Sequence, residues 1–214
     1  MILLAAGVYD MNWDDTSVAT DMTGSSTPFV AGSGGKDYIG IVGEARDRVI
    51  LKRTTAATSL TGLLQGSPNT YLANLTLSAL SSVTRTLHWD TIGTLYCDNV
   101  AFIGGGPSTG ITSSPTVQSI HRIANCHFSG NAAYAVHGGA DAAGSLRSYV
   151  WVTGNTWDHS GTIIGIDWSP AGANALTDVF ISGNTQRYFN VDPGAGAISV
   201  ILNSSNAINR NLAV

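Results

Sequence analysis

One motif recurs along the chain and constrains its fold more than any other feature: an apolar segment, an asparagine, and a second short apolar segment. Copies lie at residues 71–77, 96–102 and 122–128, and shifted copies follow at 152–157, 181–186 and 203–208. The first residues predicted to point inward in the second half of each copy are at positions 75, 100, 126, 155, 184 and 206, so the copies are spaced by 25, 26, 29, 29 and 22 residues. A constant motif with linkers of variable length is typical of a solenoid, in which each repeat packs on its neighbours.

The alternation of residues around each asparagine predicts which side chains point into the stack. In the early copies the inward residues are apolar pairs, namely Leu75 with Leu77, Val100 with Phe102 and Cys126 with Phe128. In the later copies an asparagine takes the first inward place, giving Asn155 with Trp157, Asn184 with Gln186 and Asn206 with Ile208. Asparagines at equivalent places can hydrogen bond from one repeat to the next, so we expect an amide ladder there.

Composition favours β structure over α-helix. Only 11% of the residues are charged, compared with about 25% in an average soluble domain. Glutamate occurs once and lysine twice, although these residues normally fill exposed helix faces. Together with the repeat, this predicts an all-β fold, a single-stranded parallel β-helix of roughly seven or eight coils spaced by about 4.8 Å. We expect one domain over residues 1–214, with a long polar loop at 12–35 and a C-terminal tail at 209–214.

The charge pattern excludes some partners. The formal net charge is −4 and there is no basic run, so nucleic acid and anionic membranes are poor partners. The apolar start at residues 1–7 has no basic flank, so neither a signal peptide nor a membrane span is expected.

Metal and thiol chemistry have little support in the sequence. Asp10, Asp14 and Asp15 form the densest acidic group, which is more typical of a solvated loop than of a calcium site. Cys97 and Cys126 specify neither a disulfide nor a metal site and are expected to be buried thiols. No metal and no cofactor are therefore predicted.

Several segments resemble the pectate-lyase-like right-handed parallel β-helix superfamily, in the style of bacteriophage tailspike and tail-fibre modules. These segments are residues 2–9, 38–44 with 48–52, 150–157 and 179–185. The resemblance implies right-handed winding but no single activity, because the superfamily contains polysaccharide lyases, glycoside hydrolases, tailspikes and structural virion proteins. Members usually have a capping segment before the first coil, whereas Met1 here leads directly into a predicted strand. The resemblance therefore implies either a fragment or cover by other virion chains, for which a homotrimer is the preferred arrangement.

Candidate catalytic residues are few. Cleavage of a glycosidic bond by a carboxylate pair needs two acids about 5–10 Å apart, and the candidates are Asp158, Asp167 and Asp178. His127 and His159 are expected to face outward near Asp158, where they could act as general acid or base. Turn capping and ordinary solvent exposure are the alternative for all five residues.

Aromatic residues suggest a binding surface. Sugar rings present apolar faces that pack on aromatic side chains, and the candidates are Trp168, Trp151, Tyr188 and Trp13. Plain packing or a subunit interface is the alternative, and Trp157 is assigned to the core.

The sequence favours a virion or extracellular protein that recognises surface polysaccharide, as a tailspike or tail fibre does. Two alternatives remain: a purely structural virion component, such as a capsid decoration or fibre protein, and a polysaccharide lyase or glycoside hydrolase. Few charges and the lack of a clear carboxylate pair place a free-standing enzyme last.

Overall fold

A computed structural model describes the repeats and many of the segments that connect them. It describes residues 1–10, 39–53, 63–65, 69–79, 85–89, 93–104, 109–113, 119–130, 134–138, 147–159, 164–168, 176–188, 200–202 and 208–213. Within these residues the secondary structure is β-strand, from β1 to β19, and contains no helix. The all-β prediction is therefore confirmed for the described part of the chain. The predicted loop at 12–35 lies outside it, as does position 206.

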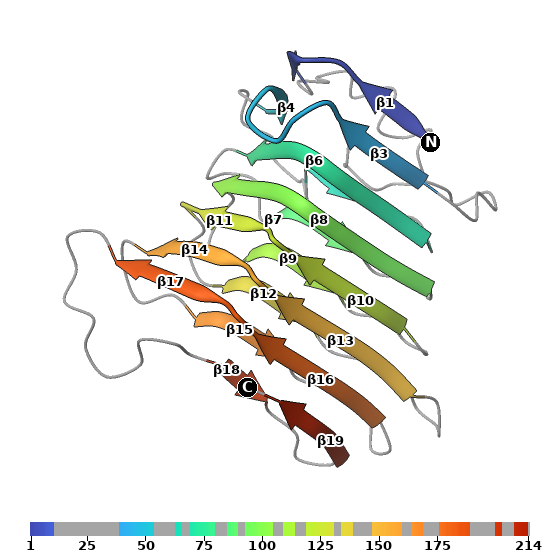
Figure 1. The fold of residues 1–214 in the computed structure, drawn as a ribbon, viewed down its shortest axis with the longest axis vertical. Helices are drawn as coiled ribbons and strands as arrows, with labels where there is room; N and C mark the ends of the chain where they lie inside the picture. Colours follow the sequence, from blue (N-terminus) through green and yellow to red (C-terminus); the bar gives the residue numbers. More distant parts are fainter. Residues whose placement is uncertain are drawn as a thin grey trace, which may run out of the picture.

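The strands form two sheets in which every pair is parallel (Figure 1). The larger sheet has 13 strands. They are β1 (Ile2–Leu4), β2 (Gly7–Asp10), β3 (Ile39–Gly43), β4 (Val49–Lys52), β6 (Asn69–Ala79), β8 (Gly93–Gly104), β10 (Ser119–Ala124), β11 (His127–Ser129), β13 (Arg147–Thr153), β14 (Thr156–His159), β16 (Leu176–Ser182), β17 (Thr185–Tyr188) and β19 (Ile208–Ala213). The predicted C-terminal tail thus includes most of β19, which pairs with β16.

The smaller sheet has six strands that fall between those of the larger sheet along the chain. They are β5 (Leu64–Gln65), β7 (Arg85–Trp89), β9 (Thr109–Ser113), β12 (Tyr134–Gly138), β15 (Ile164–Trp168) and β18 (Val200–Leu202). From β5 onward the chain therefore alternates between the two sheets, and it returns each time to the strand next to the one it left.

The register confirms the predicted stacking of five motif positions. Leu75 pairs directly with Val100. Pairing of residue 101 with 127, 127 with 156 and 156 with 185 then places Val100, Cys126, Asn155 and Asn184 in one row. Equivalent side chains consequently meet from one repeat to the next, as a solenoid requires.

The core consists of these inward rows. The predicted inward pairs of the early copies are all buried, and the Phe102 and Phe128 rings stack with centroids 4.9 Å apart. A second row, upstream of the asparagine, consists of Leu72, Cys97, Ile123, Val152 and Ile181, all buried. Each fully buried aliphatic or aromatic side chain of this kind contributes about 1.5–3 kcal/mol of hydrophobic stabilisation.

A left-handed residue turns the chain between the two halves of each motif. Asn74, Asn99 and Asn125 have φ of 54°, 54° and 55°, and Gly154 and Gly183 occupy the equivalent place with φ of 64°. Asparagine and glycine are the residues that adopt this conformation most readily. The one-place shift of the motif is thus explained: asparagine makes the turn in the early repeats, whereas glycine makes it in the later ones and asparagine moves inward.

The inward asparagines form the expected hydrogen-bonded ladder. Asn155 is fully buried; its Oδ1 accepts from the Cys126 amide at 2.8 Å and its Nδ2 donates to the Ile123 carbonyl at 2.9 Å. Asn184 repeats the arrangement one strand later, accepting from the Asn155 amide at 2.9 Å and donating to the Val152 carbonyl at 2.8 Å. Each side chain therefore hydrogen bonds to backbone groups near the turn.

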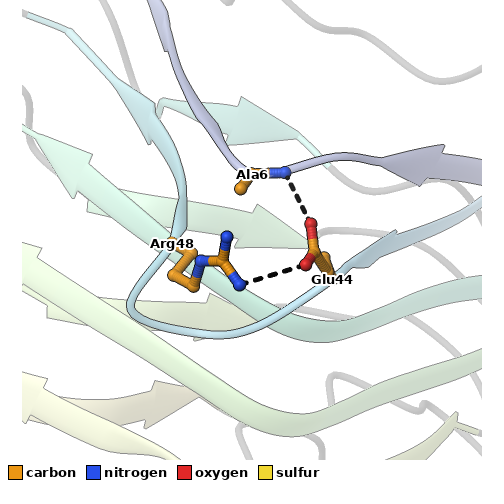
Figure 2. A network of polar contacts seen from close by, with 3 residues as sticks. All are labelled: Ala6, Glu44 and Arg48. Atoms are coloured by element: carbon orange, nitrogen blue, oxygen red, sulfur yellow. Dashed lines mark hydrogen bonds and ion pairs between the residues drawn. The ribbon is translucent and has the colours of Figure 1, made fainter.

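A polar network secures the corner between β1 and β2 (Figure 2). The carboxylate of Glu44 accepts hydrogen bonds from the Ala6 amide and from Nη1 of Arg48, both at 3.1 Å. Beyond it, β1 forms the end of the sheet, where Met1 and Leu3 are exposed.

Candidate binding face

The most distinctive outward feature is a row of ring systems that crosses five strands of the larger sheet. We define the aromatic stripe as Tyr71, Tyr96, Arg122, Trp151 and Phe180, which lie on β6, β8, β10, β13 and β16. The register pairs each of them with the next. Because the strands are parallel and in register, one side chain per repeat is enough to build a continuous stripe along the stack.

The members of the stripe stack on one another. The rings of Tyr71 and Tyr96 have centroids 5.0 Å apart and planes inclined by 20°. The rings of Trp151 and Phe180 are 5.4 Å apart and inclined by 7°. The guanidinium carbon of Arg122 lies 4.8 Å from the centre of the Trp151 ring, which is within cation–π range.

Part of the surface of these side chains is uncovered. The centroid separations of 5.0 and 5.4 Å are close to the strand spacing of about 4.8 Å, so the rings follow the spacing of the strands. The four aromatic side chains are partly exposed and Arg122 is exposed. The stripe therefore presents apolar surface together with one cation.

Polar groups line both sides of the stripe across β6 to β16. One flanking row consists of Asn69, Thr94, Ile120, Tyr149 and Asp178, and the other of Ala73, Asp98, Ala124, Thr153 and Ser182. Tyr149 also stacks on Trp151, at 5.7 Å between centroids. Burial raises the pKa of Tyr71, and the neighbouring Tyr96 and Asp98 raise it further, so its phenol stays protonated.

Two of the five candidate catalytic residues are in contact in the described part of the chain. His127 on β11 and Asp158 on β14 are in contact, with 3.3 Å between Nε2 and Oδ2, and both side chains are about one-fifth exposed. Asp167 lies on β15 of the smaller sheet. Asp178 is buried within β16, where it pairs with Tyr149 of β13. His159 ends β14, and its side chain lies outside the description.

The His127–Asp158 pair can hold and move a proton, but glycosidases use two carboxylates. The pair consists of one carboxylate and one imidazole, so it does not by itself supply the two acids of a glycosidase.

Of the candidate sugar-binding residues, the structure places Trp151 at a stacked, partly exposed position in the stripe. Trp168 and Tyr188 end β15 and β17, with side chains that are not described, and Trp13 lies outside the described residues. Sequence reasoning missed Tyr71, Tyr96, Arg122 and Phe180. The signal was available, because Tyr71, Tyr96 and Arg122 each open their copy of the motif.

Three other titratable groups of the described residues lie in the core. His121 is fully buried, and the loss of solvation lowers its pKa to about 3. Cys97 and Cys126 are free and buried, as expected, and burial raises the pKa of both thiols. Across the described residues, no group of three or more His, Cys, Asp or Glu could hold a metal ion. A helix long and apolar enough to cross a membrane is likewise absent from that part of the chain.

Comparisons with protein-family models, curated proteins and solved structures gave no match.

Proposed function

We propose that this chain is a right-handed parallel β-helix of the pectate-lyase-like kind, with seven or eight coils. Three observations support this. The main path of the larger sheet runs β1-β3-β6-β8-β10-β13-β16-β19, in chain order. From β5 onward, strands of the smaller sheet alternate with these. Right-handed crossovers between parallel strands are the rule in proteins, which supports the proposed hand.

The proposed function is recognition of surface polysaccharide through the aromatic stripe, by a virion or extracellular protein of the tailspike or tail-fibre type. The carrying observation is the stripe itself, with partly exposed rings crossing five strands. Apolar faces of sugar rings pack against aromatic rings, while hydroxyl, amide and carboxylate groups bind sugar hydroxyls. The flanking rows supply such groups, including Thr94, Asp98 and Thr153.

Another copy of this chain is the alternative occupant of the stripe. It would make the stripe a subunit interface, as in a homotrimer or a purely structural virion component. The hydroxyl-rich flanks favour sugar over this apolar alternative, because the cores of homo-oligomer interfaces are depleted of polar groups.

The test is binding of the whole chain to a glycan array, comparing the natural protein with Trp151→Ala and with Ile103→Ala. Ile103 is an exposed apolar residue on β8, beyond the Asn99 turn and outside the stripe, so its variant controls for loss of exposed apolar surface. Removing a central aromatic anchor is expected to weaken glycan binding by more than about tenfold, whereas Ile103→Ala leaves it unchanged.

Sedimentation of the same three proteins separates the alternatives. If Trp151→Ala dissociates an oligomer and leaves glycan binding intact, the stripe is a subunit interface and the proposal is wrong. Release of reducing ends from a bound polysaccharide, lost on Asp158→Asn, would instead establish the depolymerase alternative.

A further inference from the structure

We propose that the stripe selects a sparsely charged acidic polysaccharide, in which one carboxylate-bearing sugar lies at Arg122 between neutral sugars. This rests on the proposed polysaccharide binding and names its ligand class. The inference comes from the position, the contacts and the charge of Arg122.

The Arg122 side chain is positioned to bind an anion. Its guanidinium packs on the Trp151 ring at 4.8 Å, and the side chain is exposed. Because the side chain is exposed, its N–H donors are accessible to a ligand from solvent. A guanidinium stacked on a ring keeps its forked donors in a fixed plane and binds a carboxylate in bidentate fashion.

The charge of this face suits a single acid. Across β6 to β16, Arg122 is the only cation among the stripe and its two flanking rows, whereas Asp98 and Asp178 are carboxylates. Asp98 is partly exposed in the strand next to Arg122, and Asp178 is buried. A polymer with one charge on every unit would place further anions near Asp98, which is unfavourable. Nucleic acid and polyuronates are therefore poor ligands.

The positions on both sides of Arg122 in the stripe are uncharged and suit neutral sugars. Tyr71 and Tyr96 precede Arg122, and Trp151 and Phe180 follow it. At a strand spacing of about 4.8 Å, five positions extend over roughly 19 Å along the stack. Ring surface on both sides of one central cation fits a short stretch of extended sugar chain in which an acidic unit is flanked by uncharged ones.

The test uses three polymers as fluorescent oligosaccharides: gellan, which has one glucuronate per tetrasaccharide repeat; gellan whose carboxyl groups have been reduced to alcohols; and polygalacturonate, which is charged at every sugar. The natural protein is expected to bind gellan about tenfold more tightly than reduced gellan, because a charge-assisted bidentate contact is lost. Polygalacturonate is expected to bind more weakly than gellan.

Variants of Arg122 and Trp151 distinguish this inference from the proposed polysaccharide binding on which it rests. Arg122→Gln is expected to lower gellan affinity to that of reduced gellan, with Arg122→Lys between the two. Trp151→Ala is expected to weaken both gellan forms, since it removes the ring surface. If Arg122→Gln leaves gellan affinity unchanged, or if polygalacturonate binds most tightly, the inference is overturned while polysaccharide recognition stands.

Two further results complete the test. Binding to neutral array glycans without binding to gellan also overturns the inference alone. Absence of binding to every polymer and every array glycan overturns both proposals.

Discussion

Replacement of Asn155 by leucine is expected to destabilise the protein although it places an apolar residue in an apolar core. Leucine occupies the same row at position 75, so the volume suits the site. The loss comes from hydrogen bonding: the Cys126 amide loses its acceptor at 2.8 Å, and the Ile123 carbonyl loses a donor at 2.9 Å. A buried backbone group left without a partner costs about 1–3 kcal/mol. Two such groups outweigh the gain from burying leucine, so a net loss of about 1–3 kcal/mol is expected.

Urea denaturation followed by circular dichroism measures this change, and a decrease in melting temperature of roughly 5 °C accompanies it. Asn125→Gly is the matched control. It removes an exposed amide that bonds Asp98 at 2.9 Å, but glycine suits the φ of 55° and occupies the equivalent place at Gly154. Its effect is expected to stay within about 1 kcal/mol. If Asn155→Leu costs less than the control, the amide ladder does not stabilise the later repeats.

Three further predictions concern groups outside the stripe. Because burial holds the pKa of His121 at about 3 while the unfolded side chain titrates near 6.5, the unfolded state binds the proton first as the pH falls. The free energy of unfolding should therefore drop by about 1.4 kcal/mol per pH unit between about pH 6 and pH 3, with a shallower slope in His121→Leu. Glu44→Gln should increase hydrogen exchange at the Ala6 amide and change global stability by less than about 1 kcal/mol, since the ion pair to Arg48 is exposed; a larger global loss would contradict this account. Cys97 and Cys126 should resist a disulfide reagent until the chain unfolds, because burial raises the pKa of both thiols and disfavours the reactive thiolate; rapid labelling of the native protein would show that the repeats open locally.

The repeat could be predicted from the sequence because its physical cause is local. The inward pairs, such as Val100 with Phe102, follow from strand alternation, and their stacking follows from the spacing of the motif. The shift to an inward asparagine was also visible, although its reason was not. Only the backbone shows that Gly154 takes over the left-handed turn that Asn125 makes one repeat earlier.

The candidate site was predictable only in part. His127 and His159 were expected to face outward near Asp158, and the structure shows His127 in contact with Asp158. Asp167 and Asp178 were grouped with Asp158 because they are near in sequence, but each repeat crosses between two sheets, and Asp167 lies on the smaller one whereas Asp158 and Asp178 lie on the larger one. Trp151 was chosen as a single residue, since a stripe depends on register between strands 25–29 residues apart, which composition does not reveal.

The inward and outward rows of side chains meet different physical requirements. The inward rows have to be apolar or internally hydrogen bonded for any function, because they form the core on which the stack depends. The outward rows are free of that demand, and polar residues such as threonine are also favourable on the solvent face of a strand. Four partly exposed aromatic residues and one stacked arginine lie at the same outward position in five successive strands of the main sheet path, and formation of the core does not require them there. Contiguous exposed ring surface of this kind is typical of a binding site. For this reason the stripe, rather than the histidine–aspartate pair, is where we place the function of the molecule.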